Sequence, residues 1–352
     1  MVTQAVSKLS WLIEVDNCQN VLFLGEGNFS FSAGLVRRFC CSSSTKHIWS
    51  TCYESDESKT DINNTNTEAQ TVKKENMEYL VTRGCRVVEG VDAEHLDQDH
   101  RLDGLMFNKI IFMFPHVGGK MKINRNRELL KNIIFNCRRL IQEESGTIII
   151  TLCRGQGGTE AETVLRSRAD TWRIVDTCHE ADCVLSHVEP FPHDEVSDYS
   201  SVGYRGLFKR FNVEGSMMHF IKKRSPRLFK QIRSVTDDDD EKEEEPCPGD
   251  SCAASLYPPH HTHHLSYWLP PHLHTLDNDM METVISRTGA GDVVETWTRI
   301  TQYQDDESGR RSETVELVFC DQHHPLGHTR ALHLLIEILG RSLEYCYHAK
   351  LR

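Results

Sequence analysis

The sequence predicts an α/β domain with a largely parallel sheet, followed by a smaller α+β domain. Three observations lead to this prediction. Short apolar runs alternate with amphipathic segments in the first half of the chain, a glycine-rich turn follows the first apolar run, and a run of acidic residues divides the chain. Strands that alternate with helices form a parallel sheet covered on both faces.

Five short apolar runs are typical of buried parallel strands. They cover residues 21–24, 47–53, 85–91, 109–114 and 147–152. Helical patterns lie between them, a short one over 73–81 and the clearest over 124–142, where apolar residues recur at helical spacing. Two later runs, 183–188 and 212–221, have no strong helix between them, so we expect an antiparallel pair at one sheet edge. Five parallel strands closed by such a pair form the Rossmann-like sheet of S-adenosylmethionine methyltransferases.

An acidic segment divides the chain into two predicted domains. Residues 237–245 hold eight acidic residues and one lysine, and prolines and a glycine follow directly. This composition is typical of a linker. We therefore expect a Rossmann-like first domain over 1–233, an acidic linker over 234–255 and a second domain over 256–352.

The segment before the linker is basic, although the net charge of the chain is −12. Six cations fall within twelve residues, among them Lys222, Lys223, Arg224 and Arg227. A basic segment next to an acidic run suits contact with RNA or nuclear import. The alternative is a solvated connector whose charges pair with each other.

The thirteen cysteines indicate a reducing compartment. They form no Cys-x-x-Cys pair, and the sequence has neither a signal peptide nor a long apolar span. We expect a soluble protein of the cytoplasm, with the nucleolus or nucleus as the alternative, and no membrane partner. The histidines His260, His261, His263 and His264 resemble a metal cluster, but no cysteine pair joins them and His264 begins a predicted strand, so we predict no metal site.

The turn after the first strand is the clearest candidate for a cofactor site. Gly25, Glu26, Gly27 and Asn28 follow a buried strand and open a helix, whose first N–H groups can meet an anionic part of a ligand. Ser30 stands where a dinucleotide fingerprint requires glycine or alanine, and no Gly-Lys-Ser/Thr sequence follows. The turn therefore favours a smaller group, such as the amino-acid end of S-adenosylmethionine. The alternative is an ordinary glycine-rich loop.

Polar residues follow the other strands at the edge where open α/β sheets bind ligands. Glu54, after the second strand, could accept both ribose hydroxyls, and Asp92, after the third, could accept from an adenine amino group. The fourth strand ends at Pro115 and His116, followed by a flexible loop over which a target base could lie. Each acid alone is more often a helix cap or a solvated loop charge, but together, on consecutive strand ends, they favour a binding site.

Four blocks of sequence resemble one enzyme family, the large-subunit rRNA uridine-N(3) methyltransferases. These blocks cover 22–32, 90–92, 110–120 and 126–130, and the resemblance spans about residues 18–223. It implies S-adenosylmethionine as cofactor, bound by Gly25, Glu26, Gly27, Asn28, Glu54 and Asp92, and methyl transfer to a base nitrogen. The proton on uridine N(3) must then leave, and His116 beside Pro115 is the candidate acceptor, because imidazole titrates near neutral pH. The alternative role for His116 is to order its loop through backbone hydrogen bonds.

The C-terminal segment resembles a ferredoxin-fold anticodon-binding domain, a module known from the end of phenylalanyl-tRNA synthetase chains. The resemblance rests on 257–259, 264–270, 293–296, 311–319 and 351–352. The pattern itself predicts strands over 264–269, 293–303 and 312–320, helices over 276–287 and 328–345, and a short last strand over 350–352, which together form a split β-α-β unit. A structured RNA, rRNA or tRNA, is the implied partner, and not DNA.

The chain departs from the first family's pattern at two positions. The resemblance implies an acid at position 108 and an asparagine at 113, where this chain has Asn108 and Met113. A polar group expected to hydrogen-bond the target base is therefore replaced. Two functions stay open: a uridine-N(3) methyltransferase of rRNA with an RNA-binding module, or a non-catalytic protein that binds RNA or tRNA or associates with phenylalanyl-tRNA synthetase.

Overall fold

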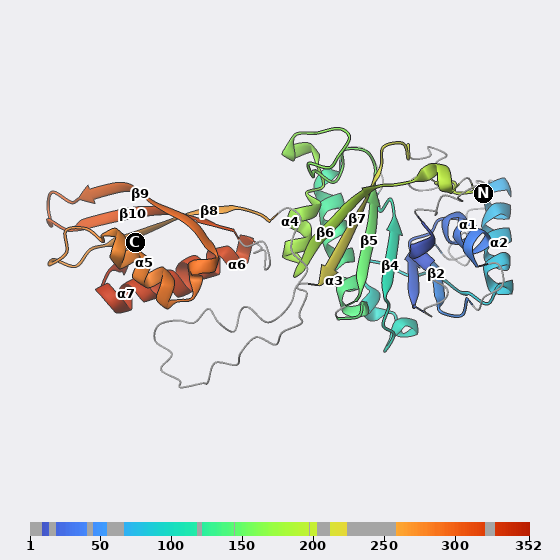
Figure 1. The fold of residues 1–352 in the computed structure, drawn as a ribbon, viewed down its shortest axis with the longest axis horizontal. Coiled ribbons are helices and arrows are strands. Elements are labelled where there is room, and N and C mark those ends of the chain that lie inside the picture. Colours follow the sequence, from blue (N-terminus) through green and yellow to red (C-terminus); the bar gives the residue numbers. More distant parts are fainter. Residues whose placement is uncertain are drawn as a thin grey trace, which may run out of the picture. The chain divides into compact units, whose positions relative to one another are not determined.

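The computed structural model describes ten segments of the chain, residues 9–13, 19–40, 45–54, 67–117, 122–143, 145–196, 198–202, 212–223, 258–320 and 328–352. Its contacts divide the chain into two compact units, Met1–Lys223 and Arg224–Arg352. Figure 1 shows the elements of both units. The predicted linker over 234–255 and the predicted RNA contacts Arg224 and Arg227 lie outside the described residues.

The first unit contains a seven-stranded sheet in the order β3-β2-β1-β4-β5-β7-β6. The first five strands are parallel, and β7 is antiparallel to both of its neighbours. This is the Rossmann-like methyltransferase arrangement, so the predicted fold class and the predicted antiparallel pair are confirmed. The strands are β1 (Val21–Leu24), β2 (Ile48–Cys52), β3 (Arg86–Glu89), β4 (Lys109–Met113), β5 (Thr147–Leu152), β6 (Cys183–Pro190) and β7 (Met217–Lys223).

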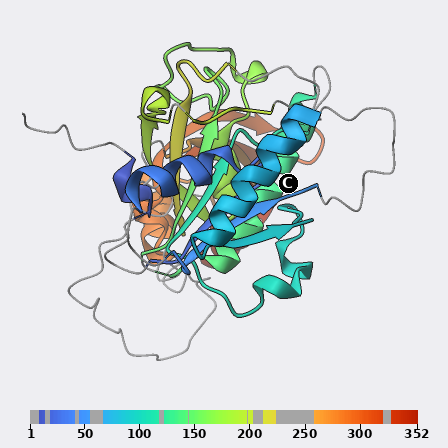
Figure 2. The same cartoon turned by 90° about the vertical axis from the view of Figure 1, so that its right-hand side faces the viewer.

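Four α-helices cover the two faces of this sheet. Helices α1 and α2 pack against each other on one face, as Figure 2 shows from the side, and α3 and α4 pack together on the other. This follows from right-handed crossovers that run outward in opposite directions from the centre of the sheet. The helices are α1 (Ser30–Phe39), α2 (Thr67–Thr82), α3 (Ile123–Leu140) and α4 (Ile174–Glu180), with short 3-10 helices η1 (Ser10–Ile13), η4 (Leu96–Gln98), η5 (His100–Leu102), η6 (Arg168–Asp170) and η7 (His193–Glu195).

Apolar side chains on both faces of the sheet form the core of this unit. On the α3 side, the helical spacing predicted from the sequence buries Leu130, Ile133, Ile134 and Cys137. On the other face, Phe23 of β1 packs edge-on against Phe31 of α1 at a ring separation of 5.9 Å. Burial of such side chains contributes about 1.5–3 kcal/mol each, which fixes the strand order and hence the position of the strand ends.

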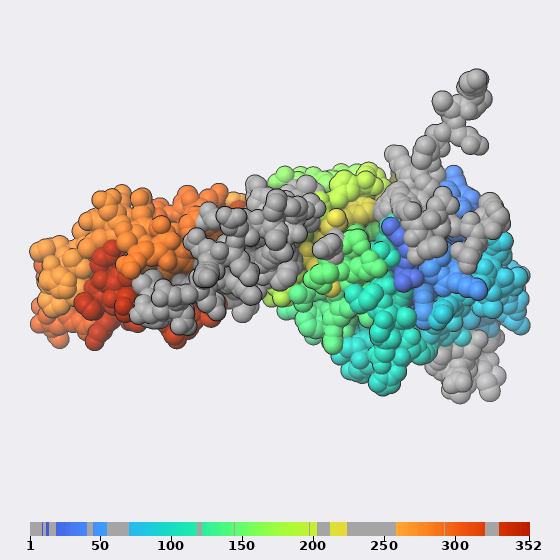
Figure 3. Space-filling view, turned by 60° about the horizontal axis from the view of Figure 1, so that its bottom comes forward, coloured from blue at the N-terminus to red at the C-terminus, as the bar shows by residue number. Residues whose placement is uncertain are grey.

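The second unit is a four-stranded antiparallel sheet in the order β11-β8-β10-β9. This is the order of a ferredoxin-like fold, as the split β-α-β pattern predicts. Helices α5 and α7 pack together, and Figure 3 shows the surface of this unit in orange and red. The elements are β8 (His261–Trp268), α5 (Asn278–Arg287), η10 (Ala290–Asp292), β9 (Val294–Gln304), β10 (Arg311–Phe319), α6 (His328–His333), the π-helix η11 (Leu334–Gly340), α7 (Arg341–Tyr347) and β11 (Lys350–Leu351).

Among the residues that the structure describes, no helix combines the length and the apolar character needed to cross a membrane.

Candidate active site

The glycine turn lies between β1 and α1, at the carboxyl edge of the sheet. Gly25 has a φ of +64°, and a Cβ atom there would lie 2.4 Å from the ring of Phe112 on β4. A Cβ on Gly27 would lie 2.1 Å from Cγ2 of Val202. The sequence suggests glycines that let a ligand approach, whereas the structure shows that both glycines are also required by the chain's own packing.

Glu26 holds the turn from inside the protein. Its side chain is buried, and its carboxylate accepts hydrogen bonds from the backbone N–H of Ser32, at 3.1 Å, and from the Ser32 hydroxyl. Burial raises the pKa of Glu26 to about 7, against the opposite effect of the two Ser32 hydrogen bonds. Glu26 therefore caps the first turn of α1, and its contribution to a cofactor site is to position the turn.

A second segment, 198–202, covers the same turn. The Asn28 side chain donates to Oγ of Ser200 at 2.9 Å, and its Oδ1 accepts from the N–H of Ser30 at 3.1 Å. The N–H of Ser200 in turn donates to Oγ of Ser30 at 3.0 Å. With Val202 against Gly27, this segment of the β6–β7 connection fixes the shape of the turn and limits access to it.

An aromatic cluster lies under this edge of the sheet. It joins α1, the end of β4 and the β6–β7 connection through Phe31, Phe114, Phe191 and Tyr199, whose ring centroids lie 5.5–6.2 Å apart. Burial, reinforced by the nearby Glu26 carboxyl, raises the pKa of the Tyr199 phenol. Phe114 has a φ of +53°, a strained conformation that residues at functional sites adopt more often than others. The cluster therefore forms a packed apolar layer next to the site.

The two predicted adenosine contacts follow adjacent strands. Glu54 lies two residues beyond β2 with an exposed side chain, and Asp92 lies three residues beyond β3 and is partly buried. Asp92 accepts from the N–H of Glu94 at 2.9 Å and contacts Nδ1 of His95 at 3.1 Å, and this contact raises the pKa of His95. Since β2 and β3 are parallel neighbours, both carboxylates lie at the same edge as the glycine turn.

A partly buried ion pair also stabilises this region. Nζ of Lys73 on α2 pairs with Oε1 of Glu89, the last residue of β3, and lies 3.4 Å from the backbone oxygen of Glu54. The pair ties α2 to the ends of β2 and β3. It thereby fixes the backbone that carries Glu54.

The predicted catalytic residues follow β4. Pro115 is buried, and His116 is half-buried with its ring centroid 5.7 Å from that of Trp172. Burial lowers the pKa of His116, so its imidazole is neutral at pH 7 and able to accept a proton. The N–H of Val117 donates to Oδ1 of the buried Asn126 at 3.1 Å, which fixes the loop that carries His116.

The loop after β5 is held by buried polar contacts that the sequence did not reveal. The buried carboxylate of Glu162 accepts from the N–H groups of Gly155, at 2.8 Å, and Gly157, at 2.9 Å, and lies 3.6 Å from Nε2 of the buried His219 on β7. The N–H of Trp172 donates to the Gln156 oxygen at 2.7 Å. The glycines in this loop indicate that another group lies close to the loop backbone. That group, the carboxylate of Glu162 next to His219, could not be identified from the sequence because the two residues are far apart in the chain.

Three residues that the sequence analysis singled out lie at the other edge of the sheet. Asn108 precedes β4 and therefore lies at the amino edge of the sheet, where its Oδ1 accepts from the N–H of Asn20 at 3.0 Å. Lys222 and Lys223 end β7, which is antiparallel, so they lie at that same edge, with Nζ of Lys223 2.6 Å from Oε2 of Glu143. Position 108 thus cannot contact a base at the carboxyl edge, and the two lysines are not brought together with His116.

Met113 does lie at the carboxyl end of β4. Its sulfur accepts from the hydroxyl of Thr151 on β5 at 3.3 Å. A thioether is a weak acceptor, so this position offers a base much less hydrogen-bonding capacity than an amide would.

The histidines at the start of the second unit do not converge. His264 contacts Glu316 across the strand pair at 3.1 Å. The ring of His260 lies between Glu295, 2.8 Å from Nδ1, and Cys320, 3.6 Å from Nε2. The ligand atoms of His260, Glu295 and Cys320 lie within 4.8 Å of one another, but the two ring nitrogens face different partners.

One family model matches this chain over residues 22–203, and its description is "BMT5-like: rRNA (uridine-N3-)-methyltransferase". The matched range holds the glycine turn, the two predicted adenosine contacts and His116. The chain belongs to this BMT5-like family. The resemblance found in the sequence is therefore confirmed at the level of the family.

Two curated relatives are similar in sequence to this chain. Ferredoxin-fold anticodon-binding domain-containing protein 1 of Homo sapiens is 34% identical over 208 residues, which are 59% of this chain and 31% of the human protein. The homolog of Mus musculus is 33% identical over 208 residues, 32% of its length. The chain thus aligns with about a third of the length of these relatives.

A crystal structure of an S-adenosylmethionine-dependent methyltransferase from Clostridium acetobutylicum ATCC 824 is 10% identical over 62% of this chain and 92% of that chain. Its TM-score is 0.35, which is too low to support a fold assignment. The fold class rests on the strand order of the seven-stranded sheet.

The residues of this BMT5-like chain fit S-adenosylmethionine at the carboxyl edge. Glu54 and Asp92 would hold the adenosine, because carboxylates accept from ribose hydroxyls and from an amino group. The backbone of the glycine turn, fixed by Glu26 and Asn28, would hold the amino-acid end. Among the described residues, segment 198–202 lies over this turn, with Ser200 bonded to Asn28 and Val202 against Gly27.

Proposed function

We propose that this chain is an S-adenosylmethionine-dependent methyltransferase that methylates N(3) of a uridine in RNA, with rRNA as the first candidate. The observation that carries this proposal is the half-buried His116, whose pKa is lowered by burial, at the carboxyl end of β4, on the same sheet edge as the glycine turn, Glu54 and Asp92. The family supports the same reaction class. The second unit, with its ferredoxin-like strand order, would bind structured RNA.

The chemistry requires alignment and the removal of one proton. When bound, S-adenosylmethionine would supply an activated methyl group for N(3), and an imidazole nitrogen of His116 would accept the N(3) proton. Trp172 and Phe114 would limit water around this step. Correct positioning of the reacting groups alone can supply roughly 7–11 kcal/mol. Since N(3) lies on the Watson–Crick edge, the target uridine must be unpaired or flipped out.

A second function is favoured by two observations. Met113 occupies the position where the family resemblance implies an asparagine, and Val202 lies directly against Gly27. Both fit a protein that has kept the fold and binds RNA or tRNA, or associates with phenylalanyl-tRNA synthetase, without catalysis. For either function we propose a cytoplasmic location, with the nucleolus or nucleus as the alternative, which imaging of a fluorescently tagged chain would test.

Cofactor titration separates the two functions. Isothermal titration of the full chain with S-adenosylmethionine should give saturable binding that Glu54→Ala weakens roughly 10- to 150-fold, because the ribose loses a charged acceptor worth roughly 1.5–3 kcal/mol. The matched control is Glu78→Ala on α2, an exposed glutamate whose partner is Lys74. If the affinity for S-adenosylmethionine is the same in wild type and both variants, the proposed adenosine site is wrong. If S-adenosylmethionine does not bind at all, the non-catalytic function is favoured.

A further inference from the structure

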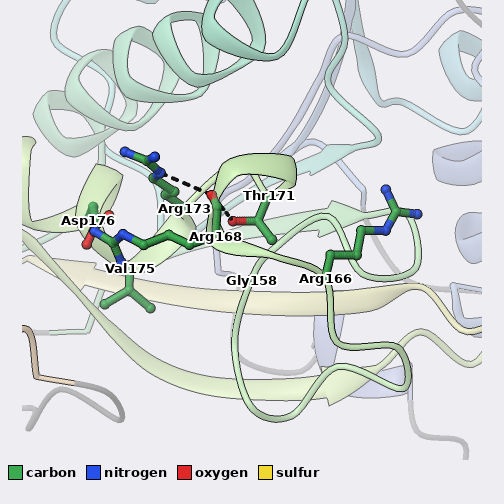
Figure 4. A pocket seen from close by; sticks show the side chains of 7 residues that line it. All are labelled: Gly158, Arg166, Arg168, Thr171, Arg173, Val175 and Asp176. Carbon is green, nitrogen blue, oxygen red and sulfur yellow. Dashed lines mark hydrogen bonds and ion pairs between the residues drawn. The ribbon is translucent and has the colours of Figure 1, made fainter. Parts of the chain in front are cut away.

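A small cavity lies in the connection between β5 and α4, outside the cofactor site. Its volume is about 150 Å³. Figure 4 shows the residues that line it, which we call the arginine pocket: Arg166, Arg168, Arg173, Gly158, Thr171, Val175 and Asp176. A water molecule needs about 10–15 Å³ of such volume, so the pocket has room for a phosphate group.

Hydrogen bonds from Arg127 of α3 to the backbone of the lining loop stabilise the shape of the pocket. The Arg127 guanidinium donates to the backbone oxygen of Thr171, at 2.7 and 2.9 Å, and to that of Ala169 at 2.9 Å. Gly158 has a φ of +78°, and a Cβ there would lie 2.6 Å from Oγ1 of Thr171. Arg173 adopts a φ of +53°, a conformation that costs a non-glycine residue free energy. Its Nε donates to the Arg168 oxygen at 3.3 Å, as the dashed line in Figure 4 marks.

Positive charge exceeds negative charge in the lining, which has three arginines and one aspartate. Arg168 pairs with Asp176 at 2.6 Å, but its side chain remains 72% exposed. Arg166, also exposed, donates to the backbone oxygen of Arg154 at 2.8 Å. Besides burial, the charges of Arg173 and Arg168 lower the pKa of Arg127, in agreement with a local excess of positive charge. Guanidinium groups match phosphate oxygens in geometry and charge.

The pocket adjoins the candidate base site. Trp172, whose ring faces His116 at 5.7 Å, stands in the chain between Thr171 and Arg173. A nucleotide whose base lies near His116 would therefore have the phosphates of its own strand close to the three arginines.

We propose that the arginine pocket binds a phosphodiester group of the RNA strand that presents the target uridine. This inference rests on the proposed function, since it takes RNA as the substrate. The sequence had suggested Lys222 and Lys223 for RNA contact, but they lie at the opposite edge of the sheet. Phosphate contacts position a nucleic acid without reading its sequence, so the pocket would set the register of the strand and leave the choice of base to the site around His116.

The test is an RNA-binding measurement that does not depend on methyl transfer. The full chain is titrated into a fluorescein-labelled, single-stranded uridine decamer of RNA, and Kd is followed by anisotropy at several KCl concentrations. Arg166→Ala should weaken binding three- to tenfold and reduce the slope of log Kd against log salt by about 0.7, the value for one lost phosphate contact on a single strand. The matched control is Arg139→Ala on α3, an exposed arginine paired with Asp97 near the amino edge.

A second variant gives an effect of the opposite sign. Asp176→Asn removes the pocket's one acid and releases Arg168, so it should tighten RNA binding two- to threefold and make the salt slope steeper. A merely structural role for this ion pair would predict weaker binding instead. Inorganic phosphate should compete with the decamer in the wild type and less well in Arg166→Ala.

The outcomes are distinguishable from failure of the proposed function. If S-adenosylmethionine does not bind but the two pocket variants behave as expected, the enzyme proposal fails and the phosphate site stands. Unchanged Kd and salt slope in Arg166→Ala, or an equal loss in Arg139→Ala, would overturn the phosphate site whatever the cofactor does.

Discussion

Replacing Glu26 by glutamine tests the electrostatics of the glycine turn. Glu26 is 7% exposed, and burial raises the pKa of its carboxyl from 4.5 to about 7. Between these two pH values the unfolded chain releases the proton while the folded chain keeps it. The folded state therefore binds more protons in this window, and stability falls as pH rises from 4.5 to 7. The difference between the two pKa values corresponds to about 3 kcal/mol.

Glutamine keeps the size of the side chain and an oxygen that can accept from Ser32, but it cannot ionise. Guanidinium denaturation of the full chain, followed by tryptophan fluorescence between pH 4.5 and 8, gives the free energy of unfolding of each variant. We expect the difference between Glu26→Gln and wild type to shift in favour of the variant by about 3 kcal/mol from pH 4.5 to 7.5. The second unit is the same in both proteins, so its contribution cancels.

Glu78→Gln serves as the control, because the Glu78 side chain is 67% exposed. It should leave the pH dependence of the wild type unchanged. The reasoning is refuted if Glu26→Gln and wild type lose stability in parallel across this range, since the carboxyl would then ionise in the folded state as readily as in the unfolded chain.

Two further predictions concern packing and a buried charge. Gly27→Ala should destabilise the first unit by roughly 1–3 kcal/mol, because the added Cβ would lie 2.1 Å from Val202. Val202→Ala in the same chain should recover most of the loss of thermal stability, and an unaffected Tm in the single variant would show that segment 198–202 does not press on the turn. In the second unit, Glu313 is 1% exposed and accepts from the Tyr267 hydroxyl at 3.1 Å, from the Thr275 hydroxyl at 2.5 Å and from the N–H of Leu276 at 3.2 Å, with Arg299 3.3 Å away. Glu313→Ala should therefore cost about 3–5 kcal/mol in chemical denaturation, since it leaves these donors unpaired. Glu316→Ala, in the same strand but partly exposed, should cost less than 1 kcal/mol as an exposed pair, and equal losses in the two variants would contradict the assigned role.

The sequence predicted most of the fold because local pattern and burial agree there. The runs over 21–24 and 147–152 coincide with β1 and β5, whose residues are almost all buried. The run over 85–91 was longer than β3, because Gly90 takes a φ of +70° and ends the strand. The helix over 328–345 includes a π-helical stretch, Leu334–Gly340, which a periodicity of 3.6 cannot reveal.

The site was less predictable because its side chains depend on contacts between distant segments. Strand order alone places Glu54, Asp92 and His116 at one edge, and the sequence suffices for that. The Glu26 side chain points into the protein because it bonds to Ser32. The segment that covers the glycine turn is held there by Ser200, which is far from Asn28 in the sequence.

The arginine pocket was missed for a different reason. Its arginines are spread between Arg166 and Arg173 with Asp170 among them, so the segment does not stand out as a continuous basic run. Only the fold shows that Arg127 turns the loop so that three arginines line one cavity. The basic run over 222–233 was conspicuous in sequence, but its described part lies at the opposite edge.

Methyl transfer to RNA tests the central claim most directly. The full chain is incubated with isotopically labelled S-adenosylmethionine and unmodified large-subunit rRNA transcripts, and nucleosides are identified by mass spectrometry. We predict labelled N(3)-methyluridine, a rate that His116→Ala lowers about 10²–10⁴-fold, and a cofactor Kd that this variant leaves nearly unchanged. Absence of label in every RNA offered, by a chain that binds the cofactor, would contradict the account. Equal losses of rate and cofactor affinity in His116→Ala would assign this residue a structural role.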